Sequence, residues 1–247
     1  MVVGVDGCRG PARQGGGWLL VEMGEDGAFG AAAAVGSFAE VLAATGAADL
    51  VLVDIPMGLP DRDRPTRACD REARRLVGPR RSSVFPPPAR AALGAAGYAA
   101  ACVQNREATG RAISRQAWGL APRIAQVDAA LRARPDLQAR CREAHPEVGF
   151  CALNGWRPLA HPKRQPAGVA ERLGILSRYT PDAAAWFEAA SVRWPRSAVD
   201  ATDILDAMVL ALTARRARLR GLPTLPVDPP SDACGLRMEM VCPAPLP

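Results

Sequence analysis

The chain has 247 residues, of which 49% are hydrophobic and 23% charged, and its formal net charge is +6. This composition is typical of a globular protein rather than a disordered one, and no stretch approaches the roughly 18 consecutive apolar residues of a membrane span. Seven cysteines without a CxxC spacing and only two histidines argue against a disulfide framework, a structural zinc site and a histidine-rich metal site.

The first quarter of the chain predicts strands, because short apolar runs alternate with turn residues. The expected strands are residues 2–6, 18–23, 29–35 and 50–53. The first two flank a glycine-rich turn and predict a hairpin. The run at 50–53 has no polar alternation, which is typical of a central parallel strand covered on both faces. Between the last two strands, Ser37 is expected to cap a short helix.

Residues 61–137 are expected to form a largely helical insertion that carries most of the positive charge. Residues 61–81 contain eight arginines and four acidic residues, a net charge of +4. Helical periodicity places several of these arginines opposite an apolar face. The side chains suited to phosphate oxygens are Arg67, Arg71, Arg74, Arg75, Arg80, Arg81, Ser82 and Ser83. A solvated face with local acidic partners explains these arginines equally well, and the stretch from Arg80 to Ser83 could equally dock the insertion onto the sheet.

The second half of the chain predicts mainly helices. The expected helices are residues 98–109, 122–134, 167–178 and 198–219, and the expected strands are 137–144 and 236–241. The last helix has apolar residues at helical spacing and arginines near its C-terminal end, where they stabilise the helix dipole.

Five carboxylates lie where an α/β sheet binds ligands. Asp6 and Asp54 each end an apolar strand, and ligands bind at the carboxyl ends of such strands. Glu147 follows a later predicted strand, and Asp203 and Asp206 are neighbours on one side of the last helix. Clustered acids repel one another unless a cation lies between them, and hard divalent cations bind carboxylate oxygens. The pattern therefore indicates a metal site, and a pair of such ions can activate a water and stabilise the leaving oxygen of a phosphodiester.

Structural explanations exist for several neighbouring features. Asp200 begins the last helix and is expected to cap it. The glycines at 15–17 could cradle a phosphate, as in actin-like ATPases, but no Walker pattern is present and a hairpin turn explains them. His145 could orient a water or tune Glu147, and a structural hydrogen bond is an equal alternative.

The order of these features resembles the ribonuclease H-like superfamily. More specifically, the chain resembles the bacterial family called domain of unknown function 429, described as predicted ribonuclease H-like nucleases. The matching stretches cover nearly the whole chain and are VVGVDGCRG, VLVDIPMGLP, CDREARRLVGPRRSSVFPPP, SRQAWGL, EAHPEVGFCALNG, KRQPAGVAERL, DATDILDA and GLRMEM.

This resemblance implies an α/β fold, as one domain over residues 1–247. Its mixed five-stranded sheet has three antiparallel strands and then two parallel ones, is flanked by helices, and carries the insertion 61–137 between its fourth and fifth strands. The first and fourth strands are neighbours in such a sheet. The catalytic acids implied are Asp6, Asp54, Glu147, Asp203 and Asp206. The chain departs from the family by five extra residues at 11–15, which could alter access near Asp6.

The sequence therefore predicts a metal-dependent nuclease that hydrolyses phosphodiester bonds of nucleic acid. Asp6, Asp54 and Asp206 would hold Mg²⁺ or Mn²⁺, and Asp203 and Glu147 would be ligands or orienting groups. The N-terminus lacks a basic region before an apolar core, so a cytoplasmic location without a membrane partner is expected. Two alternatives remain open: an actin-like enzyme that binds a nucleotide or phosphometabolite, and a non-catalytic binding protein on the same fold.

Overall fold

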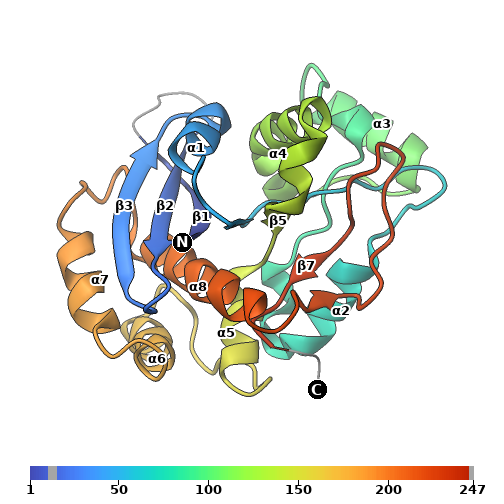
Figure 1. Cartoon of the computed structure of the whole chain (residues 1–247). Coiled ribbons are helices and arrows are strands. Elements are labelled where there is room, and N and C mark those ends of the chain that lie inside the picture. Colours follow the sequence, from blue (N-terminus) through green and yellow to red (C-terminus); the bar gives the residue numbers. More distant parts are fainter. Residues whose placement is uncertain (11–15, 245–247) are drawn as a thin grey trace.

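The fold is known from a computed structural model that describes residues 1–10 and 16–244 (Figure 1). Five strands form one mixed sheet in the order β3-β2-β1-β4-β5. The strands are β1 (Val2–Cys8), β2 (Gly17–Met23), β3 (Phe29–Val35), β4 (Leu50–Val53) and β5 (Cys141–Glu143). The first three are antiparallel neighbours, and β4 and β5 continue parallel to β1. The predicted α/β class and mixed five-stranded sheet are confirmed, and the arrangement is consistent with a ribonuclease H-like one.

Helices cover both faces of this sheet (Figure 1). They are α1 (Phe38–Ala44), α4 (Arg115–Ala133), α5 (Pro146–Leu153), α6 (Pro166–Ser177), α7 (Ala183–Ser191) and α8 (Ala201–Arg218). One core joins Val51 and Val53 of β4 to α1 and α4, and a second core joins Leu50 and Leu52 to α8. Successive side chains of a strand point to opposite faces. An apolar residue is therefore required at every position of β4, which explains its unbroken apolar run.

The predicted helical segment between the fourth and fifth strands is present. Its elements before α4 are α2 (Ala68–Leu76), η1 (Gly78–Ser83), η2 (Arg90–Ala92) and α3 (Tyr98–Thr109), and η3 (Pro135–Ala139) follows α4. Its helix α4 is part of the sheet's cover, since Ile124 and Val127 lie in the core with β4. The prediction that this helix starts at Pro122 is wrong. It begins at Arg115 because Ser114 caps it, and Pro122 lies inside the helix.

Two predicted strands are shorter than expected. The segment 137–144 contains η3 and then only β5. The segment 236–241 contains only β7 (Met240–Val241), which pairs with β6 (Thr224–Leu225) in a separate two-stranded sheet. The nearby Glu239 instead bonds Arg142 of β5 through a buried ion pair of 2.6 Å, so a side-chain contact replaces strand pairing there.

Close packing of β1 against α8 sets the geometry of the sheet's carboxyl end. A Cβ atom at Gly4 would lie 2.2 Å from the Ala207 carbonyl oxygen and 2.3 Å from the Ala211 backbone nitrogen. Only glycine permits this approach, which brings the β1 strand bearing Asp6 against the helix bearing Asp206. Among the described residues, no helix has the length and apolar character needed to cross a bilayer.

Candidate functional site

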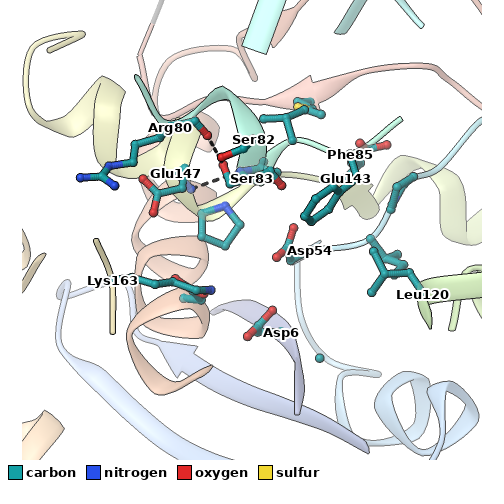
Figure 2. Close-up of a pocket in the computed structure, with 18 of the residues that line it drawn as sticks. Asp6, Asp54, Arg80, Ser82, Ser83, Phe85, Leu120, Glu143, Glu147 and Lys163 are labelled. Carbon is teal, nitrogen blue, oxygen red and sulfur yellow. Dashed lines mark hydrogen bonds and ion pairs between the residues drawn. The ribbon is translucent and has the colours of Figure 1, made fainter. Parts of the chain in front are cut away.

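A cleft of about 510 Å³ opens at the carboxyl ends of β1 and β4 (Figure 2). All five acids predicted from the sequence line it: Asp6, Asp54, Glu147, Asp203 and Asp206. They come from β1, the end of β4, α5 and α8. The fold thus gathers into one cavity carboxylates that are scattered along the chain.

Asp6 and Asp54 lie side by side because their strands are parallel neighbours. Val5 pairs with Val53 in that register, and the Asp54 backbone N–H donates to the Val5 carbonyl at 2.9 Å. Asp6 is buried, with 6% of its surface exposed. The expectation that these two strand-end acids meet is therefore confirmed.

The clustering perturbs the acids strongly. Burial raises the pKa of Asp6 well above its ordinary value, and the negative charges of Asp206 and Asp54 raise it further. Burial also raises the pKa of Asp54, while the nearby His145 lowers it, and burial raises the pKa of Asp203. A carboxyl whose charged form is this disfavoured gains from a cation beside it.

Lys163 supplies one positive charge to this cluster. Its Nζ atom donates to Asp206 Oδ2 at 2.5 Å. Although burial lowers the pKa of Lys163, the charges of Asp206 and Asp6 raise it above the ordinary lysine value. Lys163 is not among the residues that the sequence predicts for the site. One feature of the sequence could have pointed to Lys163, which is the single lysine among 31 basic residues.

Glu147 is oriented by a fully buried cation. Arg172 of α6, which is fully buried, donates to Glu147 Oε1. The other carboxylate oxygen, Oε2, is buried and accepts no hydrogen bond from the described residues. At the start of α5, the His145 Nδ1 atom accepts from the Glu147 backbone N–H at 3.2 Å, and Nε2 faces the Ser83 carbonyl. His145 therefore makes structural hydrogen bonds, which is one of the two alternatives expected for it.

Asp203 lines the cleft and also helps to cap helix α8. Its Oδ2 atom accepts from the Asp200 backbone N–H at 2.9 Å, and the Asp200 side chain accepts from Thr202. The two acids form a capping box at the start of α8. The expected capping role of Asp200 is confirmed.

The fold places only some of the predicted phosphate-binding residues in the lining of the cleft. Arg80, Ser82 and Ser83 line the cleft. The guanidinium of Arg80 donates to the carbonyls of Leu159 and Ala160, so it docks the helical segment onto the chain ahead of α6. Outside the cleft lining lie Arg71, Arg74, Arg75 and Arg81.

The expectation that Arg67 belongs to an exposed basic face is wrong. Arg67 precedes the first turn of α2, and only 2% of its surface is exposed. Its guanidinium donates to Glu143 and lies 3.4 Å from Asp70 Oδ1. Because it precedes the helix, helical periodicity does not determine its direction, and two buried carboxylates attract it inward.

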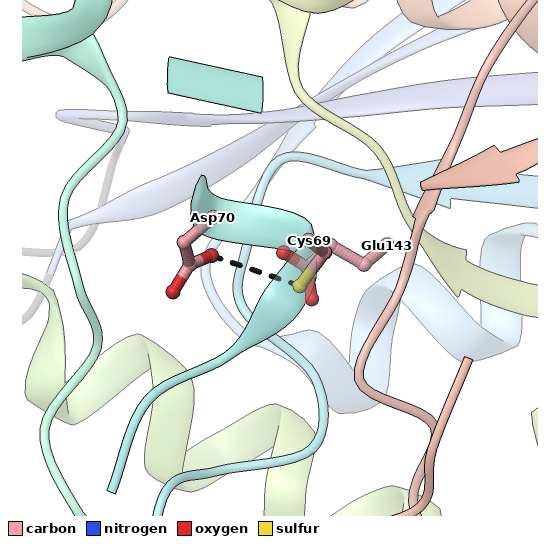
Figure 3. A group of neighbouring side chains, drawn as sticks. All are labelled: Cys69, Asp70 and Glu143. Atoms are coloured by element: carbon pink, nitrogen blue, oxygen red, sulfur yellow. Dashed lines mark hydrogen bonds between the residues drawn. The ribbon is translucent and has the colours of Figure 1, made fainter. Parts of the chain in front are cut away.

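The same carboxylates belong to a buried group with Cys69 (Figure 3). One ligand atom from each of Cys69, Asp70 and Glu143 lies within 4.8 Å of the others, a spacing that could hold a metal ion. Burial raises the pKa of Glu143 to about 8, and Arg67 opposes that shift. Asp70 and Glu143 also line the cleft, and since a guanidinium already supplies the positive charge, we assign this group a structural role in the cleft wall.

Comparison with known protein families gives a match over most of the chain. The model of the family described as "Protein of unknown function (DUF429)" matches residues 4–231. No curated protein and no solved structure matches the chain. The matched span includes the whole acid cluster and Lys163. The extra residues at 11–15 also fall within it, but they lie outside the residues that the structure describes.

Proposed function

Because the chain belongs to the DUF429 family, whose description gives no activity, we propose a function from its cleft: a divalent-metal-dependent hydrolase that cleaves phosphodiester bonds of nucleic acid. The observation that carries the proposal is the meeting of Asp6, Asp54 and Asp206 from three separate elements in one cleft. Burial, and then the negative charges of Asp206 and Asp54, raise the pKa of Asp6, and a bound cation would favour its ionised form.

The chemistry of the residues present fits Mg²⁺ or Mn²⁺, but their ligand atoms would have to draw together around the ion, because among the described residues only the Cys69 group has three ligand atoms within 4.8 Å of one another. Both ions take oxygen ligands, and Asp6, Asp54 and Asp206 would hold the metal through their carboxylates. Glu147 lines the same cleft, and its Oε2 atom is buried and accepts no hydrogen bond from the described residues. When bound, the metal would polarise a phosphoryl oxygen and lower the pKa of an attacking water.

The chain's own residues would orient the reacting groups. Arg172 holds Glu147 in place in the lining of the cleft. Ser82 and Arg164 are exposed on the lining, where a hydroxyl and a guanidinium can bind phosphate oxygens. These groups position a sugar–phosphate backbone without reading its bases.

The shape of the cleft favours a second candidate, a hydrolase of nucleotide-sized phosphate esters. Its volume of about 510 Å³ lies in the usual range for small-molecule sites, about 300–1,000 Å³. The arginines outside the lining would not contact such a substrate. A nuclease acting in the same cleft would take a single strand or a chain end more readily than an undistorted duplex.

The test is hydrolysis by metal-stripped protein with added Mn²⁺. The substrates are single-stranded, duplex and branched nucleic acids, together with small phosphodiesters and phosphomonoesters. We expect Asp6→Asn to lower kcat by roughly 100-fold or more, since metal-held charge contributes several kcal/mol to such transition states. The matched control is Asp63→Asn, the same chemical change at an exposed position outside the cleft.

The outcomes separate the candidates. Cleavage of polynucleotides supports the nuclease, and cleavage of only the small esters supports the second candidate. Full activity in the Asp6→Asn protein would contradict both, because each requires Asp6 as a metal ligand.

A further inference from the structure

The aromatic ring of Phe85 is a feature of the cleft to which the proposed function gives no role. Phe85 lies just after η1 and lines the cleft, where it is partly exposed. Every other aromatic side chain that the structure describes packs in a hydrophobic core or, as for Tyr179, lies under an arginine. Among the described residues, Phe85 is thus the aromatic side chain that joins no core and contacts neither another ring nor a cation.

The chain holds Phe85 in place from both sides. Before it, Val84 is buried in a core shared with α2, and the Arg74 guanidinium donates to the Val84 carbonyl at 2.7 Å. After it, residues 86–88 are all prolines, which restrict the backbone, and two of them are buried. A ring on so rigid a support loses little conformational freedom when a ligand binds against it.

The two sides of the cleft differ in chemistry. Figure 2 shows Phe85 and Leu120 on one side of the carboxylates of Asp6 and Asp54, and Lys163 on the other. Leu120 packs against the core that joins β4 to α4, and it is also partly exposed in the lining of the cleft. A ligand that fills the cleft therefore meets an apolar surface on one side of the acids and a positive charge on the other.

Two charged residues come near the apolar side, and the protein itself binds both. Glu143 is 2% exposed and accepts from the Arg67 guanidinium. Arg123, which shares α4 with Leu120, donates to the Cys8 carbonyl of β1. A ligand beside the Phe85 ring therefore meets mainly apolar surface.

We propose that Phe85 and Leu120 form a subsite for a nucleobase, so that the substrate is a nucleotide unit and not a base-free phosphate ester. This inference deepens the proposed function and rests on it for the place of the phosphate, beside the acids. Every nucleobase has a flat π-face that stacks on aromatic side chains, so the subsite accepts a base without reading its identity. The cleft volume of about 510 Å³ has room for a base and its phosphate together.

Affinities for two probes that differ only in the base test the proposal. The probes are thymidine 5′-monophosphate and the same sugar phosphate with hydrogen in place of the base, measured by calorimetry with Ca²⁺ present. We expect the wild type to bind the nucleotide about 5- to 100-fold more tightly, the range that base–aromatic stacking contributes. Phe85→Leu, which keeps an apolar side chain but removes the flat ring, should lose most of this preference. Its affinity for the base-free probe should stay unchanged.

Two further variants separate stacking from a general effect on the fold. Phe85→Trp keeps a flat aromatic face and should keep the preference. Tyr179→Leu is the matched control, because it removes an exposed ring outside the cleft lining, and it should bind both probes as the wild type does. Stacking also quenches the fluorescence of 2-aminopurine, so a nucleotide with this base should be quenched by the wild type and not by Phe85→Leu. Melting curves verify that each variant is folded.

Equal affinity of the wild type for the two probes, or an undiminished preference in Phe85→Leu, would overturn the proposal. Failure of both probes to bind would do the same. If base-free phosphodiesters are hydrolysed as fast as nucleotide esters, the hydrolase stands and the base subsite fails. A preference that depends on Phe85 in a protein without hydrolytic activity would contradict the hydrolase and keep the subsite. Comparing polynucleotides with mononucleotide esters as substrates then distinguishes a nucleotide unit within a strand from a free nucleotide.

Discussion

Arg67 compensates two buried acids in the wall of the cleft, because its guanidinium lies between Glu143 and Asp70. All three side chains are nearly inaccessible to solvent. In a medium of low dielectric, two carboxylates this close require a cation. Arg67 therefore stabilises the wall of the cleft, a role different from the phosphate contact predicted for it.

Replacing Arg67 with methionine should destabilise the protein by about 3–5 kcal/mol, the usual cost of removing one partner from a buried ion pair. The loss should be larger at pH 8 than at pH 5, because Glu143, with a pKa of about 8, takes up a proton at the lower pH. Urea unfolding measures both values. Arg71→Met, an exposed change on the same helix, should stay within about 0.5 kcal/mol of the wild type. Equal effects of the two variants would contradict the structural role of Arg67.

At the scale of elements, the contact of β1 with α8 determines where the acids lie. The absence of a side chain at Gly4 lets the strand touch the helix backbone at Ala207 and Ala211. Asp6 and Asp206 then face the same cleft. The geometry of the cluster is thus a consequence of packing two elements that are remote in sequence.

Gly4→Ala should disrupt this packing. The added Cβ meets backbone atoms that cannot rotate away, so the elements must separate, at a cost of about 1–3 kcal/mol or more. Mn²⁺ binding should weaken as well, because Asp206 moves away from Asp6. Thermal unfolding and Mn²⁺ titration measure the two effects.

Gly119→Ala is the matched control for that variant. Gly119 lies in α4, and a Cβ atom added there would meet nothing within 4 Å. Alanine at this position should stabilise the helix by up to about 1 kcal/mol. A Gly4→Ala protein as stable as the wild type would show that the β1–α8 contact can relax freely.

For the whole molecule, the clustered acids predict an unusual dependence of stability on pH. The pKa values of Asp6, Asp54 and Asp203 are raised in the folded protein, and that of Glu143 is raised to about 8. An acid with a higher pKa in the folded state favours folding while it is protonated. Its contribution to the free energy of unfolding is complete below the ordinary carboxyl pKa of about 4. The contribution is lost as pH rises through the pKa of the acid in the folded protein.

The melting temperature of the metal-free protein should therefore fall as pH rises from about 5 to 8. Added Mn²⁺ should reverse the trend, since it binds the ionised carboxylates. In the presence of EDTA at pH 8, the Asp6→Asn protein should melt a few degrees above the wild type. The Asp63→Asn protein should melt at the wild-type temperature. Melting curves across this pH range are the measurement, and parallel profiles for Asp6→Asn and the wild type would contradict the prediction.

Local sequence patterns determined several strands and helix ends of this protein. The apolar run at β4, the hairpin of β1 and β2 and the helix caps at Ser37 and Asp200 depend on neighbouring residues, so they can be recognised in the sequence. The resemblance to a family added the strand order, and with it the meeting of Asp6 and Asp54.

Only the tertiary structure decided which charges compensate the acids. Arg67 meets Glu143, Arg172 meets Glu147, and Lys163 meets Asp206, each across a long stretch of chain. No local pattern encodes these pairs, because a charged side chain is solvated or buried according to what the fold brings beside it. Five acids that line the cleft could therefore be picked out from the sequence, whereas the cations that balance them followed from the packing of remote segments.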